Sequence, residues 1–238
     1  MIKESSYDEN YFDLRLDDVG ASTKCYERYS KNIFGNLGFL KDRRLLGAWG
    51  PYEELNINEY DYLLDSLKRN KKRMAVAITA NWLDSKNKLL PFNFKFPEQA
   101  YLLKKADQMG LITIVNHGLT HSVVGMHMPK LFNSNRIFHR DFADWLPEFM
   151  HKKIIRQSQE ILENWLDREV NILAPPGNQY SLKTIKACSD TNLKYIHSSL
   201  NLIPPNSNLI HLSLKNCKCF HDREIKLFGH KFIDSLFY

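Results

Sequence analysis

The sequence has no long apolar run and little cysteine, and both shortages narrow what the chain can be. No apolar stretch approaches the roughly 20 residues of a transmembrane helix, so the sequence predicts no membrane span. The opening stretch MIKESSYDENYFDL has neither the basic region nor the apolar region of a secretory signal, which predicts a cytoplasmic location. In that compartment the four cysteines are expected to be reduced, and Cys217 and Cys219 are predicted to be core thiols.

The sequence also has no internal repeat, no low-complexity linker and no recognisable nucleic-acid-binding module, so a nucleic-acid partner is not expected. With 238 residues, of which 43% are hydrophobic, the chain can bury a substantial core, and we predict one domain over residues 1–238. The formal net charge of +6 is interpreted as a solvated surface. The basic cluster KRNKKR at 68–73 leaves open contact with an anionic substrate or peripheral contact with an anionic membrane surface.

Apolar strand patterns and amphipathic helix patterns alternate along the chain. The seven predicted strands are residues 11–16, 74–79, 111–116, 170–175, 193–198, 209–214 and 217–221. The predicted helices between and after them are residues 56–70, 97–110, 147–167, 181–190 and 224–237. This alternation predicts an α/β fold, a parallel sheet or barrel whose functional site lies at the carboxyl ends of the strands.

Two adjacent carboxylates, Asp17 and Asp18, follow the first predicted strand. Asp13, Arg15 and Asp17 alternate with leucines, so their side chains are expected to face inward, with Asp13 and Arg15 forming a pair. A carboxylate pair at a strand end can supply a metal ligand and a general base. It can equally belong to a turn or a helix cap, and the residues alone leave both interpretations open.

The stretch NHGLTHS follows the third predicted strand and places His117 and His121 four residues apart. On a helical turn this spacing puts both imidazoles on one face, where they could bind one metal ion. The alternative is a pair of capping or surface histidines. Three further histidines, His139, His151 and His230, are predicted to lie on the surface.

Two more polar stretches follow later strands. LAPPGNQYS contains Pro176 and Gly177, and the glycine leaves its backbone N–H open to a close-approaching ligand, unless the loop is only a rigid connection. CFHDRE places His221 and Arg223 after the last predicted strand. A histidine there can act as a general acid because its ordinary pKa lies near neutrality, but it can also be a hydrogen-bonded loop residue.

The four motifs occur in a fixed order at four strand ends: DD, HxxxH, PPG and HD. In that order, LRLDDVG, NHGLTHS, LAPPGN and CFHDRE resemble the polysaccharide deacetylase superfamily (NodB-like, carbohydrate esterase family 4), over residues 11 to about 222. The resemblance implies a single-domain distorted (β/α) barrel of about seven parallel strands. It also implies amide hydrolysis that depends on one divalent metal ion, most often zinc.

The resemblance implies a chemical role for each motif residue. Those roles are general base for Asp17, metal ligand for Asp18, His117 and His121, and general acid for His221.

The third motif carries both a role and a departure. The loop at Pro176 and Gly177 would supply a backbone N–H to the developing oxyanion. The family's arginine before the PP dipeptide, which steadies the base aspartate, is replaced here by Ala174. Arg15 and Arg223 are the possible substitutes, and period two places Arg15 on the same face as Asp17.

Other departures concern the substrate. Gly118 stands where the family has Ser or Thr after the first histidine, and the family's aspartate-and-tryptophan motif has no clear counterpart. His197 occupies that part of the rim and is expected to contact the substrate or support the site. Loop insertions are predicted near 21–55 and 80–97.

The function implied by the resemblance is metal-dependent N-deacylation of an acylated amino sugar, with release of an acetyl or formyl group. Without a secretory signal, the expected substrate is a precursor, a nucleotide-linked sugar or a lipid-linked glycan in surface-polysaccharide biosynthesis. The alternative is a non-catalytic carbohydrate-binding barrel, which the missing arginine favours. A glycoside hydrolase on a similar barrel is a third hypothesis, and it would give HxxxH no role.

Overall fold

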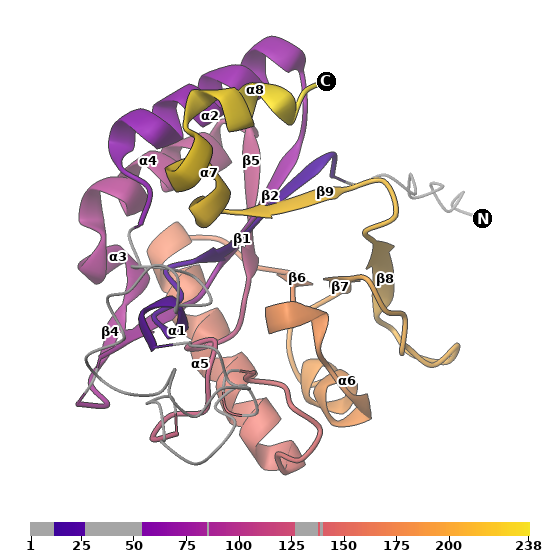
Figure 1. The fold of residues 1–238 in the computed structure, drawn as a ribbon. Coiled ribbons are helices and arrows are strands. Elements are labelled where there is room, and N and C mark those ends of the chain that lie inside the picture. The colour runs from indigo at the N-terminus through magenta and orange to yellow at the C-terminus, as the bar shows by residue number, and fades with distance from the viewer. Residues whose placement is uncertain (1–11, 27–53, 85, 127–137, 139) are drawn as a thin grey trace, which may run out of the picture.

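A single curled sheet organises the molecule (Figure 1). The computed structural model describes residues 12–26, 54–84, 86–126, 138 and 140–238. Seven strands form this sheet in the order β8-β7-β6-β5-β2-β1-β9, and every described pairing within it is parallel. They are β1 (Leu14–Val19), β2 (Met74–Ile78), β5 (Ile112–Asn116), β6 (Ile172–Leu173), β7 (Tyr195–Ser198), β8 (Ile210–Ser213) and β9 (Lys218–His221). The α/β architecture with seven parallel strands is confirmed, as a half-barrel.

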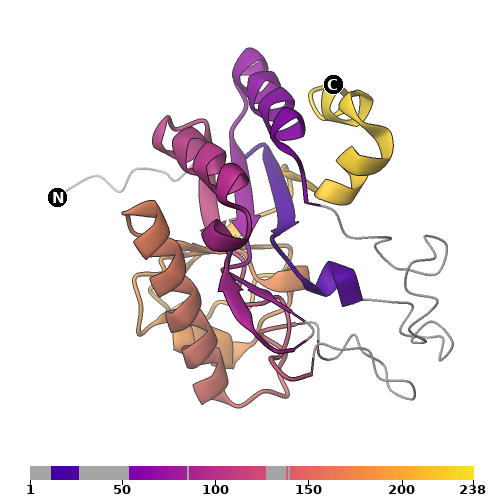
Figure 2. The same cartoon turned by 90° about the vertical axis from the view of Figure 1, so that its left-hand side faces the viewer.

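Helices cover the convex face of the sheet. Figure 2 shows α2, α4 and α5 following one another down one side of it. The helices are α1 (Thr23–Tyr26), α2 (Ile57–Asn70), α3 (Phe92–Lys95), α4 (Pro97–Gln108), α5 (Glu148–Leu166), α6 (Leu182–Cys188), α7 (Asp222–Phe228) and α8 (His230–Ser235). The local signals that predicted the long helices hold: Asn56 caps α2 in a capping box with Glu59, and Pro97 opens α4. The predicted C-terminal helix is divided at Gly229 into α7 and α8.

Two apolar clusters lie on the two faces of the sheet, because successive side chains of a strand point to opposite faces. Leu14 and Leu16 pack in the outer cluster with the helices, as their alternation predicts. The inner cluster is small, and alanines of β2 contribute to it. Its buried members are Phe12, Ala75, Ala77, Val115, Ile172, Ala174, Tyr195 and Leu212. Small residues inside a curled sheet leave room for the polar side chains that line the same face.

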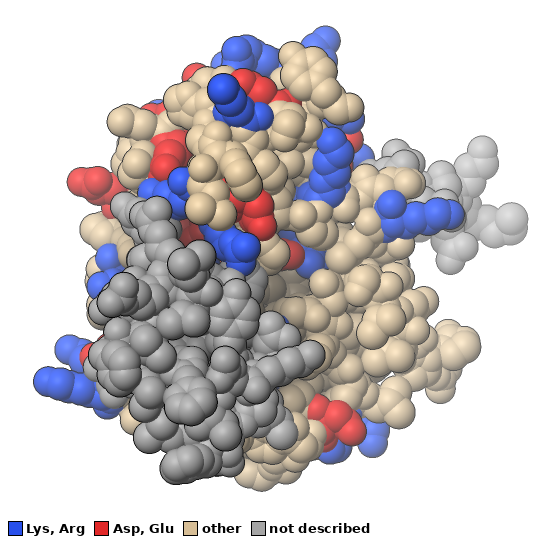
Figure 3. All heavy atoms as spheres, in the orientation of Figure 1, with Lys and Arg blue, Asp and Glu red and all other residues tan. Residues whose placement is uncertain are grey.

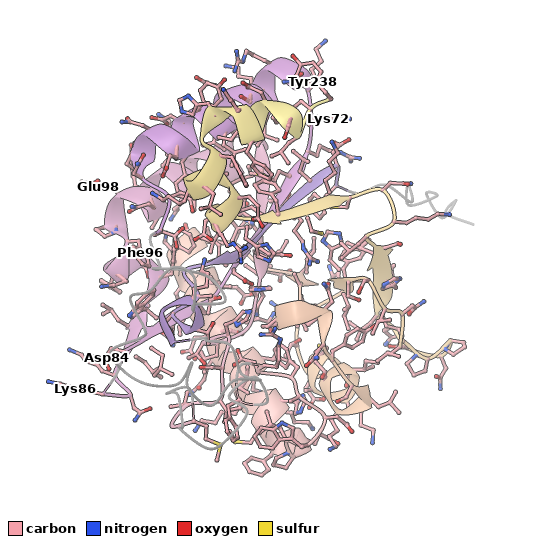
Figure 4. All side chains as sticks on the ribbon, in the orientation of Figure 1. Lys72, Asp84, Lys86, Phe96, Glu98 and Tyr238 are labelled. Atoms are coloured by element: carbon pink, nitrogen blue, oxygen red, sulfur yellow. The ribbon has the colours of Figure 1, made fainter. Side chains whose placement is uncertain are left out.

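The predicted insertion near 80–97 contains regular structure that the sequence analysis missed. β3 (Asn81–Leu83) and β4 (Leu89–Pro91) form an antiparallel hairpin. Asp84 and Lys86 lie at its tip (Figure 4), where the Asp84 carboxylate accepts the Lys86 N–H at 2.8 Å. The short helix α3 follows the hairpin directly. Most of the other predicted insertion, residues 27–53, lies outside the described residues.

Charge and burial test three smaller predictions. On the face in Figure 3, Lys and Arg are interspersed with Asp and Glu, in accord with a solvated surface. His151 is buried and Cys219 is exposed, so the predictions of a surface histidine and a core thiol are wrong at these positions, whereas His230 is exposed. Cys217 is partly buried beside the inner cluster, and His139 lies outside the described residues. In the described part of the chain, no helix is long and apolar enough to cross a membrane.

Candidate functional site

The two adjacent aspartates of β1 face the same site because the strand is irregular between them. Leu16 pairs with Val76 and Val19 with Ile78, so the register of β1 shifts against β2 across Asp17 and Asp18. Asp18 has a φ of +62°, in the left-handed region. A bulge of this kind turns a side chain that would otherwise point to the opposite face. The inward face of β1 therefore gains a second carboxylate at its carboxyl end.

Asp18, His117 and His121 converge at the ends of β1 and β5. His117 Nε2 lies 2.9 Å and His121 Nε2 lies 3.1 Å from the same oxygen, Asp18 Oδ1. All three residues are buried, and within the described ranges they are the one group of three or more His, Cys, Asp or Glu side chains arranged to hold a metal ion. One carboxylate and two imidazoles are a donor set that suits a catalytic divalent cation such as zinc, with a position left for water or substrate.

Both imidazoles also have a partner at Nδ1, the ring nitrogen that does not face Asp18, as metal-ligating histidines usually do. His117 Nδ1 lies 2.6 Å from the carbonyl oxygen of Ala174, which can only accept, so Nδ1 carries the hydrogen and Nε2 keeps its lone pair. His121 Nδ1 lies 3.0 Å from the hydroxyl of Thr23. The residues therefore fit a divalent cation, because they would present one carboxylate oxygen and two Nε2 atoms to it.

The protonation states agree with that arrangement. Burial opposes ionisation of Asp18, but the His121 and His117 imidazoles outweigh it and hold the pKa of Asp18 well below its ordinary value. Burial lowers the pKa of His121 in spite of the neighbouring Asp18 charge. An ionised carboxylate beside a neutral imidazole is the state in which these groups bind metal.

The loop that carries both histidines is not helical, so the helical-turn interpretation is wrong. Gly118 has a φ of +84° and His121 a φ of +59°. The loop is shaped by Asp141, whose Oδ2 accepts the backbone N–H groups of Leu119, Thr120 and His121 at 2.7, 3.1 and 3.2 Å. Burial raises the pKa of Asp141 to about 6, against these hydrogen bonds.

Asp141 also explains the glycine in the histidine motif. A Cβ atom at Gly118 would lie 2.4 Å from Asp141 Oδ2, and the positive φ disfavours any other residue there. The Gly118 N–H is accepted by the side chain of Asn116, the last residue of β5. Position 118 therefore has no side-chain hydroxyl, and the Asp141 carboxylate occupies the space where a side chain at that position would lie.

The second aspartate, Asp17, is locked to Arg15. Arg15 Nη2 donates to Asp17 Oδ2 at 2.8 Å, and Arg15 Nε makes a further ion contact of 2.7 Å with Asp17 Oδ1. The predicted pair of Asp13 and Arg15 is wrong, since Asp13 bonds Lys72 at the start of β2 at 2.9 Å. Arg15 thus holds Asp17, in a chain that has Ala174 where an arginine was expected.

Two further contacts tie this pair to other strand ends. Arg15 Nη1 donates to the backbone carbonyl of His197 at 2.8 Å, and Nη2 donates to the side chain of Asn178 at 3.1 Å. The His197 ring is buried beside Phe12, and burial together with the Arg15 charge lowers the pKa of His197 to about 3. His197 therefore stands under the site as a neutral supporting residue.

The PPG loop lies against the histidine loop. Pro176 is buried, and its Cγ would be 3.4 Å from a Cβ at Gly118. Gly177 has a φ of +59°, and a Cβ there would lie 2.3 Å from Arg140 Nε. The backbone conformation therefore favours glycine, and a side chain at position 177 would displace the Arg140 guanidinium. Gly177 is exposed at the rim of the site.

His221 ends β9 and completes the site from the other side of β1. It pairs in register with Asp17, and its Nε2 lies 3.8 Å from Asp18 Oδ2. Its Nδ1 lies 3.5 Å from Glu224, whose carboxylate also accepts the His221 backbone N–H at 2.8 Å. Burial favours the neutral ring, but Glu224, Asp18 and Asp17 outweigh it and raise the pKa of His221 to about 9.

The first residues of α7 hold His221 in place. Asp222 is buried and forms an ion pair with Lys24, with Nζ 2.6 Å from Oδ2. The Arg223 N–H donates to Asp222 Oδ1, and the Arg223 side chain is exposed. The sequence predicted that Arg15 or Arg223 would steady Asp17, and Arg15 forms this ion pair.

Five supporting residues were missed by the sequence analysis: Thr23, Asp141, Asn178, Glu224 and Arg140. One had a readable signal, since Glu224 stands three residues after His221 as the carboxylate of a capping box does. The others act across long separations in sequence, and a single sequence carries no sign of such contacts.

Comparison with known proteins gives a family. A family model described as polysaccharide deacetylase matches residues 52–196, more than half of the chain. That span includes His117, His121 and Gly177, whereas Asp17 and His221 lie outside it and reach the same site through the fold. No curated protein matches the sequence.

Solved structures are similar to the chain at low identity. A family 4 carbohydrate esterase from Streptomyces lividans in complex with acetate has 11% identity and a TM-score of 0.43, over 76% of this chain and 82% of that chain. A putative polysaccharide deacetylase from Mycobacterium smegmatis has 16% identity and a TM-score of 0.46, over 84% of this chain and 57% of that chain. A CE4 family pseudoenzyme from Bacillus anthracis has 11% identity and a TM-score of 0.45, over 76% of this chain and 56% of that chain. The chain therefore spans little more than half the length of the Mycobacterium smegmatis and Bacillus anthracis proteins. On the match of the family model, the chain belongs to the polysaccharide deacetylase family.

Proposed function

We propose that the chain is a metal-dependent N-deacylase that hydrolyses the amide of an acylated amino sugar. The observation that carries the proposal is the meeting of Asp18, His117 and His121 at one point, with Asp17 and His221 beside them. A carbohydrate-binding barrel that had lost its chemistry would have no need for a buried ligand set together with a base and an acid. The substitution of Arg15 for the missing arginine also favours catalysis over that alternative.

A divalent cation held by the ligand set would polarise the amide carbonyl and lower the pKa of a water molecule. Asp17 would accept a proton from that water, and Arg15 holds the carboxylate in position for it. His221 is protonated at neutral pH, since its pKa is raised to about 9, and it would donate a proton to the departing nitrogen. The Gly177 N–H would stabilise the oxyanion, and one such donor typically contributes about 3 kcal/mol.

The substrate would be an N-acetylated or N-formylated amino sugar carried on a precursor, a nucleotide or a lipid in surface-polysaccharide biosynthesis. Arg140 at the rim adds a cation beside Gly177, which would suit an anionic, diphosphate-bearing sugar.

The test is release of acetate or formate from a panel of acylated amino sugars that are free, nucleotide-linked or lipid-linked. The wild type loaded with zinc should release one of the two acids, and a chelator or Asp17→Asn should abolish the release. A zinc-loaded wild type that binds these sugars without hydrolysing any of them would favour the non-catalytic barrel. Release of a reducing sugar that survives chelation would indicate a glycoside hydrolase.

A further inference from the structure

Three consecutive residues at the start of α1 contact three different parts of the molecule. Ser22, Thr23 and Lys24 are all buried, although they belong to a segment that the sequence marked as a loop insertion. The Ser22 hydroxyl accepts the backbone N–H of Leu83 in β3 at 3.1 Å. Lys24 forms its ion pair with Asp222 at the start of α7. Thr23 lies between these two anchors, so its position is fixed from both sides.

The backbone before these residues is fixed as well. The Gly20 N–H donates to Glu54 Oε2 at 2.9 Å, and Glu54 Oε1 accepts the hydroxyl of Tyr60 at 3.0 Å. Gly20 needs its glycine, because φ is +73° and a Cβ would lie 2.6 Å from the Phe92 ring. The turn from β1 into α1 is therefore held by α2 and α3 before it reaches Thr23.

Thr23 uses this fixed position to contact a metal ligand. Its Oγ1 lies 3.0 Å from His121 Nδ1, while His121 Nε2 faces Asp18 Oδ1 at 3.1 Å. A neutral imidazole has one N–H and one lone pair, so Nε2 can offer its lone pair only when Nδ1 carries the hydrogen. That hydrogen needs a buried acceptor, and the Thr23 oxygen is placed to accept it.

We propose that Thr23 is a positioning residue for the metal site: it holds His121 in the tautomer and orientation that presents Nε2 to the cation. The proposal rests on the proposed function, since it assumes that the ligand set binds a metal. It gives the α1 segment a role in the site, because Ser22 and Lys24 fasten the residue that aims one ligand. Partners of this kind typically change metal affinity by about 10- to 100-fold when they are removed.

The chain offers a matched control at a distance from the site. Thr184 in α6 contacts His151 Nδ1 through its hydroxyl at 3.0 Å, the same distance as in the Thr23 and His121 pair, and all four residues are buried. His151 does not belong to the ligand set. Thr23→Val and Thr184→Val therefore each remove a hydrogen bond between a hydroxyl and an imidazole, and only the bond of Thr23 supports a metal ligand. Thr184→Val also removes the acceptor of the Ser181 N–H at the start of α6.

The experiment measures the zinc dissociation constant by competition with a chromogenic chelator for the wild type, Thr23→Val, Thr184→Val and Thr23→Ser. Thr23→Val is expected to raise the dissociation constant by about 10- to 100-fold. Thr184→Val is expected to bind zinc like the wild type, and Thr23→Ser to recover most of the affinity because it keeps the hydroxyl. Urea unfolding of the metal-free proteins is expected to show a loss of stability for Thr184→Val at least as large as that for Thr23→Val, because Thr184 also caps α6.

Three results would overturn the proposal. They are zinc affinity in Thr23→Val equal to that of the wild type, an equal loss of affinity in Thr184→Val, and no recovery in Thr23→Ser. Should Thr23→Val fail to fold, Thr23→Ala and Thr23→Ser provide the same contrast between an absent and a present hydroxyl. A wild type that binds no zinc would overturn the proposed function itself, whereas tight binding that is indifferent to residue 23 would overturn only the role of Thr23.

Discussion

The two sides of the site are built differently. On the ligand side, the side chains of Asp18, His117 and His121 are 6%, 1% and 3% exposed, and each imidazole is held at both nitrogens over distances of 2.6–3.1 Å. On the acid side, named for the role proposed for His221, that side chain is 30% exposed and makes ion contacts of 3.8 Å with Asp18 and 3.5 Å with Glu224. The ligand side is buried and closely held, whereas the His221 ring is more exposed and these two ion contacts are longer.

The position of each side in the sheet accounts for the difference. The ligand set lies on β1 and on the loop that follows β5. β1 and β5 flank β2 inside the sheet, and the carbonyl of Ala174, just after β6, backs the set. His221 lies on β9, an edge strand of the described sheet, and it is steadied by helix α7. Substitutions on the ligand side should therefore remove function outright, whereas those on the acid side should tune it.

The largest effect is expected from Asp17→Asn, between the two sides. Removing the carboxylate removes the proposed general base, and loss of such a group typically lowers kcat/KM by about 10²- to 10⁴-fold. Zinc stoichiometry should stay at the wild-type value, because Asp17 does not belong to the ligand set. Activity and metal content measured on the same preparation check both statements. Activity near that of the wild type in Asp17→Asn would remove Asp17 from the mechanism.

The next largest effect concerns the anchor of the acid side. Lys24→Met leaves Asp222 as a buried carboxylate without its 2.6 Å partner, and loss of one member of such a pair typically costs about 3–5 kcal/mol of unfolding free energy. Urea unfolding measures the loss. The control is Lys72→Met, which breaks an ion pair of 2.9 Å whose side chains are 44% and 33% exposed, and which should cost less than about 1 kcal/mol. Equal losses in the two variants would contradict the buried anchor.

A smaller effect on the ligand side is expected from Gly118→Ala. Gly118 and Gly125 have nearly equal φ values of +84° and +85°, but a Cβ at Gly118 meets Asp141 whereas at Gly125 it meets nothing within 4 Å. Strain alone typically costs about 1 kcal/mol, and the clash should add to it only at Gly118. Thermal unfolding should therefore show a greater loss for Gly118→Ala than for Gly125→Ala. Equal losses would mean that the Asp141 carboxylate moves aside freely.

The smallest effect is a shift in the pH profile from Glu224→Gln. The raised pKa of His221 keeps the ring protonated at neutral pH, and the acid form is lost as the pH rises through about 9. Removing the Glu224 charge lowers that pKa, so the alkaline limb of kcat/KM should move to lower pH. Glu59→Gln is the matched control, because Glu59 accepts the Asn56 N–H at 2.8 Å as Glu224 accepts that of His221. If Glu224→Gln and Glu59→Gln moved the alkaline limb of kcat/KM equally, the result would refute the link between Glu224 and the pKa of His221.

The sequence predicted the parts of the molecule that local patterns specify. Six strands of the sheet lie within the predicted apolar runs, whereas β1 begins and ends three residues later than the predicted 11–16, so Asp17 and Asp18 belong to the strand and do not follow it. Four motifs near strand ends predicted residues that the fold brings together. Alternation along β1 correctly put Arg15 and Asp17 on the inner face. Strands and caps are local features, so one sequence carries enough information to find them.

The rest depends on contacts between distant residues. Asp141 shapes the histidine loop from twenty residues away in sequence, at His121, and Thr23 reaches the same histidine from 98 residues away. His151 is buried in α5, where its ring contacts the hydroxyl of Thr184 on α6. The pair of Asp13 and Arg15 was predicted from spacing along β1, but Lys72 at the neighbouring strand is the closer partner. Such contacts follow from packing, which a single sequence does not reveal.

The most direct test of the account is the metal content of the purified protein. It compares the wild type, Asp18→Ala and His117→Ala with His151→Ala, which removes a buried histidine outside the ligand set. After zinc loading and removal of free metal, the wild type and His151→Ala should each hold about one ion per chain, and the two ligand variants should hold almost none. A wild type without metal, or ligand variants that keep it, would contradict the site on which the account depends.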